Sequence, residues 1–334
     1  MPGEEGLLAH LLRLRHSQRC AEVINIAFAL SIHHALHRLA TIESRTASEG
    51  QVAIKILAAP VTAEDVKIVM PHYFSLYHES FIPQVTGLSL LAKGAGATGS
   101  YAVGKVTSIG PNVSSVKAND KVFIASRGVF SEEVSVDMND VIPLTTSKTA
   151  EEMAAIPALL TAWALLHEFK SLKSNDVVVQ TNGNTAVGLA VSQIAKVKGI
   201  SVVNVTEKSL TDFKPSGEVA LCLCNASAMS RPLLKLLAPD GAFVAYSDTV
   251  EPLPSIHSVD VPVTAAIFKK VKVAGFHLMT WKEIEPAKFK NAVAEVASMI
   301  ESGKVNISSK KYKLSDYVNA MSESSTGSLV VFSI

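Results

Sequence analysis

Residues 176–196 read DVVVQTNGNTAVGLAVSQIAK, a short apolar run followed by a glycine-bearing turn and a helical stretch. A strand that passes through such a turn into a helix is the arrangement that holds the pyrophosphate of a dinucleotide at a helix amino end. Gly183 and Gly188 stand where glycine is favoured, while Ala186 stands where a further glycine is usual. The segment therefore predicts a strand–turn–helix unit whose cofactor turn is only partly typical.

Strands and helices alternate through the rest of this half of the chain, which predicts a doubly wound parallel sheet. The predicted strands are 176–180, 201–205, 219–224, 241–247 and 270–276, and the predicted helices are 187–198, 231–238 and 286–302. The half before it is rich in short strands, predicted at 51–61, 101–110, 121–126 and 131–138. A helix predicted over 151–169 contains Pro157, which forces a break or a kink.

The closing LVVFSI reads as a strand that returns to the first half of the chain. The predicted fold class is therefore α/β, with a β-rich domain interrupted by a doubly wound domain. The predicted domains are 21–150 together with 303–334, then 151–302, with 1–20 as an N-terminal arm.

Composition narrows the function classes. The 334 residues are 48% hydrophobic and 18% charged, with a net charge of +1, so bulk nucleic-acid binding is not indicated. Three cysteines are too few for a disulfide framework, which favours a reducing compartment. No apolar run reaches the roughly 18 residues of a membrane span, and the best candidate, VINIAFAL at 23–30, has the length of a strand.

The first 20 residues, MPGEEGLLAHLLRLRHSQRC, alternate leucines with arginines. This pattern resembles a mitochondrial transit peptide, although Glu4 and Glu5 count against it because such peptides are poor in acids. The other interpretation is a helical arm that is retained and docks on a partner.

Five stretches carry a family resemblance in the same order along the chain. They are IKILAAPVTAEDVKIVMPHY, VTSIGPNVSSVKANDKV, VFSEEVSV, QTNGNTAVGLAVSQIAK and IFKKVKVAGFHLMTWKE. Together they resemble the medium-chain dehydrogenase/reductase superfamily and, within it, the mitochondrial trans-2-enoyl-CoA reductases. The similarity runs from about residue 23 to residue 334.

The resemblance implies a GroES-like catalytic domain and a Rossmann-like domain that binds NADPH for reduction of an enoyl thioester. By motif position, Tyr73 would be the tyrosine that supports protonation, although it is also simply one of two loop tyrosines with Tyr77. Phe276 and Trp281 match aromatic positions near the acyl site, or belong to the core. The candidate cofactor-binding residues are Asn182, Gly183, Asn184, Val187, Gly188 and Lys208.

The largest departure from the family lies between two predicted strands. Residues 206–218, TEKSLTDFKPSGE, are far fewer than the roughly 30 that one further strand–helix–strand unit needs. The strand and helices that wall the adenine are therefore predicted to be missing. In the same segment Glu207 would repel the 2′-phosphate of NADPH unless Lys208 compensates. Glu207 could instead accept from a 2′-hydroxyl of NADH, or the two residues form a solvated pair.

Further departures lie along the cofactor path. Ser247 and Asp248 replace a Gly-Gly pair of the family, which would place a carboxylate near the nicotinamide end. IASRGVFSEE is shorter than the corresponding family loop, so part of the substrate wall is predicted to be absent.

Other chemistry has weaker support. Cys222 and Cys224, two apart on a strand, are expected to pack in the core, and no metal site is predicted. The histidines of SIHHALH (His33, His34 and His37) fit a surface turn better than a metal site. A basic stretch fits a solvated face, or a weak contact with RNA or an acidic partner. Its members are Lys304, Lys310, Lys311 and Lys313.

Two functions are compatible with this pattern. One is an active, mitochondrial, NADPH-dependent enoyl-thioester reductase. The other is a non-catalytic descendant with no cofactor, kept as a structural or assembly subunit among the proteins of a mitochondrial ribosome or respiratory complex. The departures concentrate on the cofactor path while the core strands stay hydrophobic, which favours the structural role.

Overall fold

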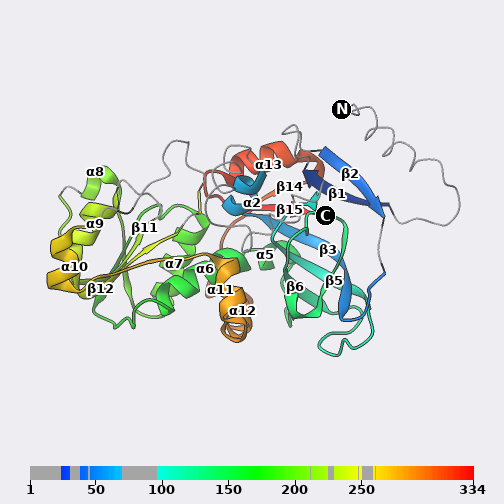
Figure 1. Ribbon diagram of the computed structural model, residues 1–334, viewed down its shortest axis with the longest axis horizontal. Helices are drawn as coiled ribbons and strands as arrows, with labels where there is room; N and C mark the ends of the chain where they lie inside the picture. Colours follow the sequence, from blue (N-terminus) through cyan, green and yellow to red (C-terminus); the bar gives the residue numbers. More distant parts are fainter. Residues whose placement is uncertain are drawn as a thin grey trace, which may run out of the picture.

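The computed structural model describes residues 24–30, 38–43, 46–69, 96–210, 212–224, 229–246, 248–249, 259 and 261–334. The chain forms a mixed β-sheet and a separate parallel sheet flanked by helices (Figure 1). Several predicted features lie outside the described residues. They are the arm over 1–20, the loop tyrosines Tyr73 and Tyr77, the histidine cluster at 33–37, and Ser247.

The mixed sheet is built around β3 (Gln51–Val61), the strand predicted over 51–61. Its side chains alternate, so that Val52, Ile54 and Ile56 are buried while Lys55 is exposed. The sheet runs in the order β14-β15-β3-β5-β6-β8, and β7 also pairs with β3. The other strands are β5 (Tyr101–Ile109), β6 (Lys121–Ala125), β7 (Glu133–Asp137), β8 (Val141–Pro143), β14 (Lys310–Tyr312) and β15 (Val330–Ser333).

The parallel sheet has the order β10-β9-β11-β12-β13. Its strands are β9 (Asp176–Gln180), β10 (Ser201–Asn204), β11 (Glu218–Cys224), β12 (Leu237–Ala245) and β13 (Lys272–Gly275). Val178 packs towards one layer of helices, while Val177 and Val179 pack towards the opposite layer. The near-continuous apolar strands arise because helices cover both faces.

The helices of the first layer are α6 (Ile156–His167), α7 (Ala186–Val197) and α12 (Pro286–Glu301), and α9 (Ser230–Leu236) covers the other face. The predicted break at Pro157 is confirmed. A short helix α5 (Ala150–Met153) ends before it, and Pro157 lies in the first turn of α6, where its missing N–H costs nothing.

The predicted loss of the adenine-side strand is also confirmed. In the described sheet β10 is an edge strand. Between β10 and β11 the described residues form only α8 (Glu207–Leu210) and irregular chain. In the described part of the chain, no strand therefore forms a wall beyond β10.

Several elements were not predicted. They are β2 (Arg38–Glu43), α2 (Ala63–Val69), β4 (Gly96–Ala97), α10 (Val263–Lys269), α11 (Leu278–Ile284) and α13 (Tyr317–Ser324). The strand-sized run at 23–30 is β1 (Ile24–Leu30), which pairs with β2 and β4. None of the helices in the described part of the chain is both long and apolar enough to cross a bilayer.

Candidate functional site

The turn between β9 and α7 forms as the sequence predicts. Thr185 caps the helix, and its side chain accepts from the N–H of Gly188 at 3.1 Å. Asn182 adopts a φ of 52°, a left-handed conformation that asparagine tolerates. A Cβ added at Gly188 would lie 2.4 Å from the carbonyl oxygen of Asn182, so only glycine allows the helix to sit this close to the turn. The turn is therefore tightly built.

A buried glutamine at the end of β9 holds the turn in place through hydrogen bonds. The Nε2 of Gln180 lies 3.0 Å from the carbonyl oxygen of Gly188, 3.0 Å from Ser192 Oγ and 2.6 Å from Asn204 Oδ1. The Asn204 side chain covers Gly183, where an added Cβ would lie 2.2 Å from the Asn204 Cγ atom. The side chain at the end of β10 thus packs on the turn.

Two of the N–H groups at the amino end of α7 are engaged by other groups of the chain. The Ala186 N–H donates to the carbonyl oxygen of Gly327 at 2.7 Å, and the Gly188 N–H donates to Thr185. The Thr185 hydroxyl also hydrogen-bonds to the carboxylate of Asp248. A pyrophosphate binds such a terminus through free N–H groups and the positive end of the helix dipole. A phosphate at this terminus would compete with these two contacts and would approach the Asp248 carboxylate.

Asp248, which was expected near the nicotinamide end of the path, hydrogen-bonds to Thr185, the cap of α7. Burial raises the pKa of Asp248 to about 6, and the hydrogen bond from Thr185 only partly opposes this. The carboxylate therefore changes charge close to neutral pH.

The remaining candidate cofactor residues are dispersed. Asn184 is exposed, whereas Val187 is buried and lines a small cavity between the mixed sheet and the parallel sheet. Lys208 lies exposed on α8 beyond the edge strand. Neither Glu207 nor Lys208 forms an ion pair with another described residue. The structure therefore brings the turn residues together and leaves Lys208 apart from them.

A cavity of about 110 Å³ lies between the mixed sheet and the carboxyl ends of the parallel strands. Pockets that take cofactors or small molecules usually have roughly 300–1,000 Å³. Tyr101 and Tyr246 line it, are 1% and 6% exposed, and have hydroxyl groups without a hydrogen-bond partner among the described residues. Burial raises the pKa of both phenols, so they remain neutral donors.

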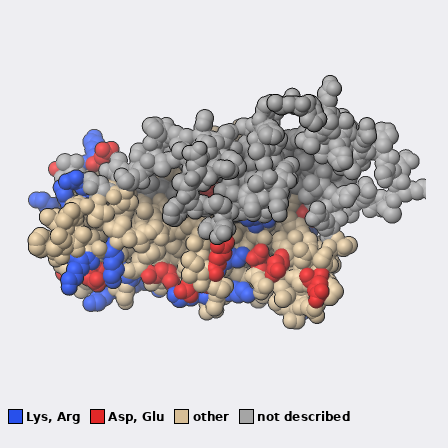
Figure 2. All heavy atoms as spheres, in the orientation of Figure 1, with Lys and Arg blue, Asp and Glu red and all other residues tan. Residues whose placement is uncertain are grey.

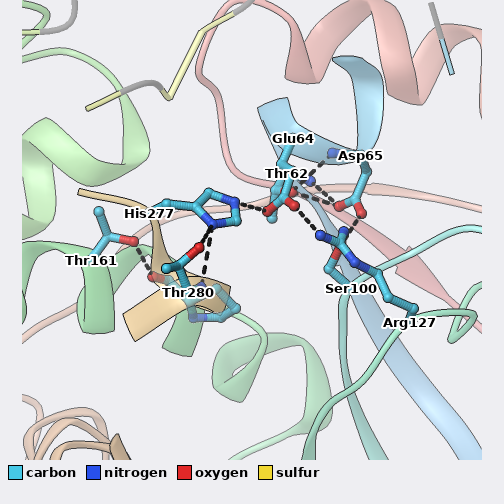
Figure 3. A network of polar contacts seen from close by, with 9 residues as sticks. Thr62, Glu64, Asp65, Ser100, Arg127, Thr161, His277 and Thr280 are labelled. Atoms are coloured by element: carbon cyan, nitrogen blue, oxygen red, sulfur yellow. Dashed lines mark hydrogen bonds and ion pairs between the residues drawn. The ribbon is translucent and has the colours of Figure 1, made fainter. Parts of the chain in front are cut away.

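A polar network crosses this cleft (Figure 3). His277, the cap of α11, accepts at Nδ1 from the Thr280 N–H at 3.3 Å. Its Nε2 therefore carries the proton and donates to Glu64 Oε2 at 3.1 Å, which joins the two sides of the cleft. Glu64 also forms an ion pair with Arg127, which lies in the loop after β6.

A second carboxylate in the network lies deeper. Asp65 accepts from Ser100 Oγ at 2.6 Å and from Thr62 Oγ1 at 2.6 Å, and Arg127 donates to Ser100 at 2.5 Å. Burial raises the pKa of Asp65 despite these bonds. Burial also acts to raise the pKa of Glu64, but the hydrogen bond from His277 and the charge of Arg127 lower it to about 2.

The two aromatic residues expected near the acyl site pack against each other, with ring centroids 6.1 Å apart. Phe276 lines the cavity. Trp281 is buried in the core, with its ring centroid 5.8 Å from that of Phe289 and 6.0 Å from that of Trp163. Its core interpretation therefore holds in this structure, while Tyr73 lies outside the described residues.

A larger cavity of about 870 Å³ lies at the amino ends of the parallel strands, where β9, β11 and β13 begin. Ligands of open α/β sheets bind beyond the carboxyl ends of the strands, so the cleft remains the candidate site. Acidic and basic side chains are mixed on the face shown in Figure 2. In the basic stretch, Lys310 pairs with Glu323 and Lys311 with Glu151.

Cys222 and Cys224 pack together against α9, and burial raises the pKa of the Cys222 thiol. Within the described ranges, no group of three or more His, Cys, Asp or Glu side chains is placed to hold a metal ion.

Comparison with known proteins identifies the relatives of this chain. The mitochondrial enoyl-acyl-carrier-protein reductase of Rattus norvegicus is 30% identical over 320 residues, which cover 84% of this chain and 79% of that protein. The chain belongs to the enoyl-acyl-carrier-protein reductase family. The human member is 28% identical over 326 residues, covering 86% of this chain and 81% of its own. No protein-family model matches the chain.

Solved structures agree in fold. A mutant enoyl thioester reductase from Candida tropicalis superposes with a TM-score of 0.74 at 19% identity, covering 93% of this chain and 100% of its own. The Etr1p/NADP/crotonyl-CoA complex gives a TM-score of 0.75, also at 19% identity, over 93% and 100% of the two chains. The GroES-like and Rossmann-like architecture expected from the sequence is confirmed.

The sequence did not single out the residues of the polar network. Glu64 is far from Arg127 and His277 along the chain, and no local pattern joins them. One signal was available in TAED at 62–65, which has the form of a capping box and predicts a helix start.

Proposed function

We propose that this member of the reductase family does not use NADPH and serves as a structural subunit of a mitochondrial assembly. The observation that carries the proposal is the amino end of α7. There the Gly327 carbonyl and the Asp248 carboxylate stand where a cofactor phosphate would have to bind. The mitochondrial setting follows the names of the curated relatives.

The adenine side supports the same proposal. Because β10 is the edge of the described sheet, an adenosine there would have a wall on one side only. The cleft between the domains is held together by polar contacts that include Glu64–His277 and Lys282–Asp140. The cavity of about 110 Å³ in this cleft is also well below the roughly 300–1,000 Å³ of pockets that take cofactors.

An exposed apolar surface offers a place for a protein partner. Val263, Ile267 and Phe268 of α10 are 70%, 61% and 79% exposed. Figure 1 places α10 at the end of the molecule remote from the mixed sheet. Contiguous apolar residues on a surface often mark protein–protein contacts. The partners we propose are protein subunits. A contact with RNA is weaker, because two of the four lysines in the basic stretch are paired with glutamates.

An active reductase is the second candidate. It is favoured by the hydroxyls of Tyr101 and Tyr246 in the cleft cavity, which have no hydrogen-bond partner among the described residues, since a buried phenol can donate to a developing enolate. In this case NADPH would be the cofactor, as the NADP complex of Etr1p suggests.

A turnover assay separates the two candidates. The full chain is mixed with crotonyl-CoA and NADPH, and absorbance of the reduced nicotinamide is followed, with the rat relative as positive control. We expect no oxidation above the rate without protein. Turnover that Tyr73→Phe abolishes and Tyr317→Phe leaves unchanged would overturn the structural role.

A further inference from the structure

An aspartate side chain lies at the amino end of α7. Asp248 follows β12, and its Oδ2 accepts a hydrogen bond from the Thr185 hydroxyl. Thr185 is the cap of α7, and its oxygen accepts from the Gly188 N–H at 3.1 Å. The carboxylate is thus joined to the helix terminus through one hydroxyl group.

A glycine from the other domain closes the same terminus. Gly327 lies in the turn between α13 and β15, and its carbonyl oxygen accepts from the Ala186 N–H at 2.7 Å. Its φ is 85°, and an added Cβ would lie 2.5 Å from Thr185 Cγ2. The turn therefore rests directly on the cap residue.

The positive amino end of α7 attracts a negatively charged group. A helix carries about half a positive charge at its amino end, which attracts a phosphate or a carboxylate. Here Asp248 supplies the negative charge from within the chain. An incoming phosphate would meet a like charge, and it would have to displace the Gly327 carbonyl from the Ala186 N–H.

We propose that Asp248 is the specificity-determining residue of this terminus, acting with Gly327 as an internal substitute for a bound phosphate. The proposal rests on the proposed function, because it explains how the cofactor is kept out. Removing the charge of Asp248 should turn the same terminus into a weak anion site.

Protonation should weaken the exclusion in the unmodified chain. The other titratable groups of the described residues around this end of the cleft are Lys67, Tyr101, Tyr246, Glu64 and His277. A protonated Asp248 would donate to Thr185 Oγ1, and the Thr185 hydroxyl would then donate to the Asn182 carbonyl, already 2.9 Å away. The negative charge facing the terminus disappears, so anion affinity should rise as pH falls through about 6.

The test is calorimetric titration of the folded full chain with inorganic pyrophosphate at pH 7.5. Asp248→Asn should bind about tenfold more tightly than the unmodified chain, a change expected from removal of one adjacent like charge. Asp240→Asn is the matched control, because Asp240 is exposed at the opposite edge of the sheet, and it should change nothing. Asp248→Ser serves as a second variant if Asp248→Asn does not fold.

A pH series with sulfate, which stays dianionic over this range, gives an independent measurement. Affinity of the unmodified chain should rise between pH 7.5 and 5, and that of Asp248→Asn should change less. Equal affinities in all variants at all pH values would overturn the inference and leave the proposed function standing. Tight NADPH binding by the unmodified chain would overturn the proposed function instead.

Discussion

Two carboxylates that line the same cleft have pKa values shifted in opposite directions. On the mixed-sheet side, Glu64 is held by Arg127 and by His277, and these partners lower its pKa to about 2. On the parallel-sheet side, Asp248 bonds to a neutral hydroxyl, and burial raises its pKa to about 6. The first is part of a charge-balanced network, while the second faces a helix dipole.

The two carboxylates differ in what they contact. The Glu64 network ties the two sides of the cleft together. The α7 terminus is engaged by a carbonyl group and faced by a carboxylate of the same chain. Under the proposed function, the first set of contacts stabilises the arrangement of the domains, while the second keeps an anion away from the helix end.

The largest expected effect comes from breaking the Glu64 network. Arg127→Ala removes the cation paired with Glu64 and the donor to Ser100, and because the paired side chains are only about a fifth exposed, the loss should approach the roughly 3–5 kcal/mol of a fully buried pair. Urea unfolding should show this loss. Lys196→Ala, an exposed change on α7, is the control and should stay within about 0.5 kcal/mol. A loss of similar small size for Arg127→Ala would contradict the charge-balanced interpretation.

Acidification should separate the two carboxylates. The pKa of Glu64 falls from 4.5 to about 2 on folding, so its contribution of about 3 kcal/mol is present above pH 4.5 and lost as pH falls towards 2. Asp248 acts in the opposite direction. Its pKa rises from 3.8 to about 6, so the stability linked to its proton is present below pH 3.8 and lost as pH rises through 6.

This prediction is checked with two variants in urea unfolding between pH 3 and pH 8. The advantage of the unmodified chain over Glu64→Gln should shrink towards pH 3. Relative to Asp248→Asn, the unmodified chain should instead lose stability as pH rises from 4 to 8. Parallel pH curves for the two comparisons would be inconsistent with the opposite pKa shifts.

A smaller effect is expected at the domain contact. Gly327→Ala forces a side chain into left-handed backbone and against Thr185, which should cost about 1–3 kcal/mol. Gly303→Ala is a matched control, because Gly303 has a φ of 69° and nothing within 4 Å of an added Cβ, so only the backbone strain of about 1 kcal/mol applies. Equal losses in thermal unfolding would mean that the contact with Thr185 is not tight.

The smallest effect is predicted for the turn itself. Ala186→Gly restores the usual glycine, but the Gly327 carbonyl still occupies the N–H of that residue and the adenine wall is still missing. No turnover on crotonyl-CoA should appear in the reductase assay. Activity gained by this single change would show that one methyl group was the obstacle.

The sequence predicted features that depend on local chemistry. The apolar alternation of β3, the proline break before α6 and the glycine turn before α7 each follow from residues close together in the chain. The short segment after β10 predicted the missing strand, because chain length limits what a crossover can contain.

Contacts between distant segments could not be predicted in this way. The contact of Gly327 with Ala186 and that of His277 with Glu64 depend on how two domains meet. Asp248 was recognised as a departure, but its place at the α7 cap followed only from the structure. Helix α10 was missed because its exposed apolar residues form no stripe facing the core.

Whether this chain binds NADPH is measured by calorimetric titration of the unmodified full chain at pH 7.5. We expect no saturable binding up to millimolar ligand, because the α7 terminus is engaged by Gly327 and faced by Asp248. The rat relative, titrated in the same buffer, is the positive control. A dissociation constant in the low micromolar range for this chain would mean that the contacts at the α7 terminus do not keep NADPH out.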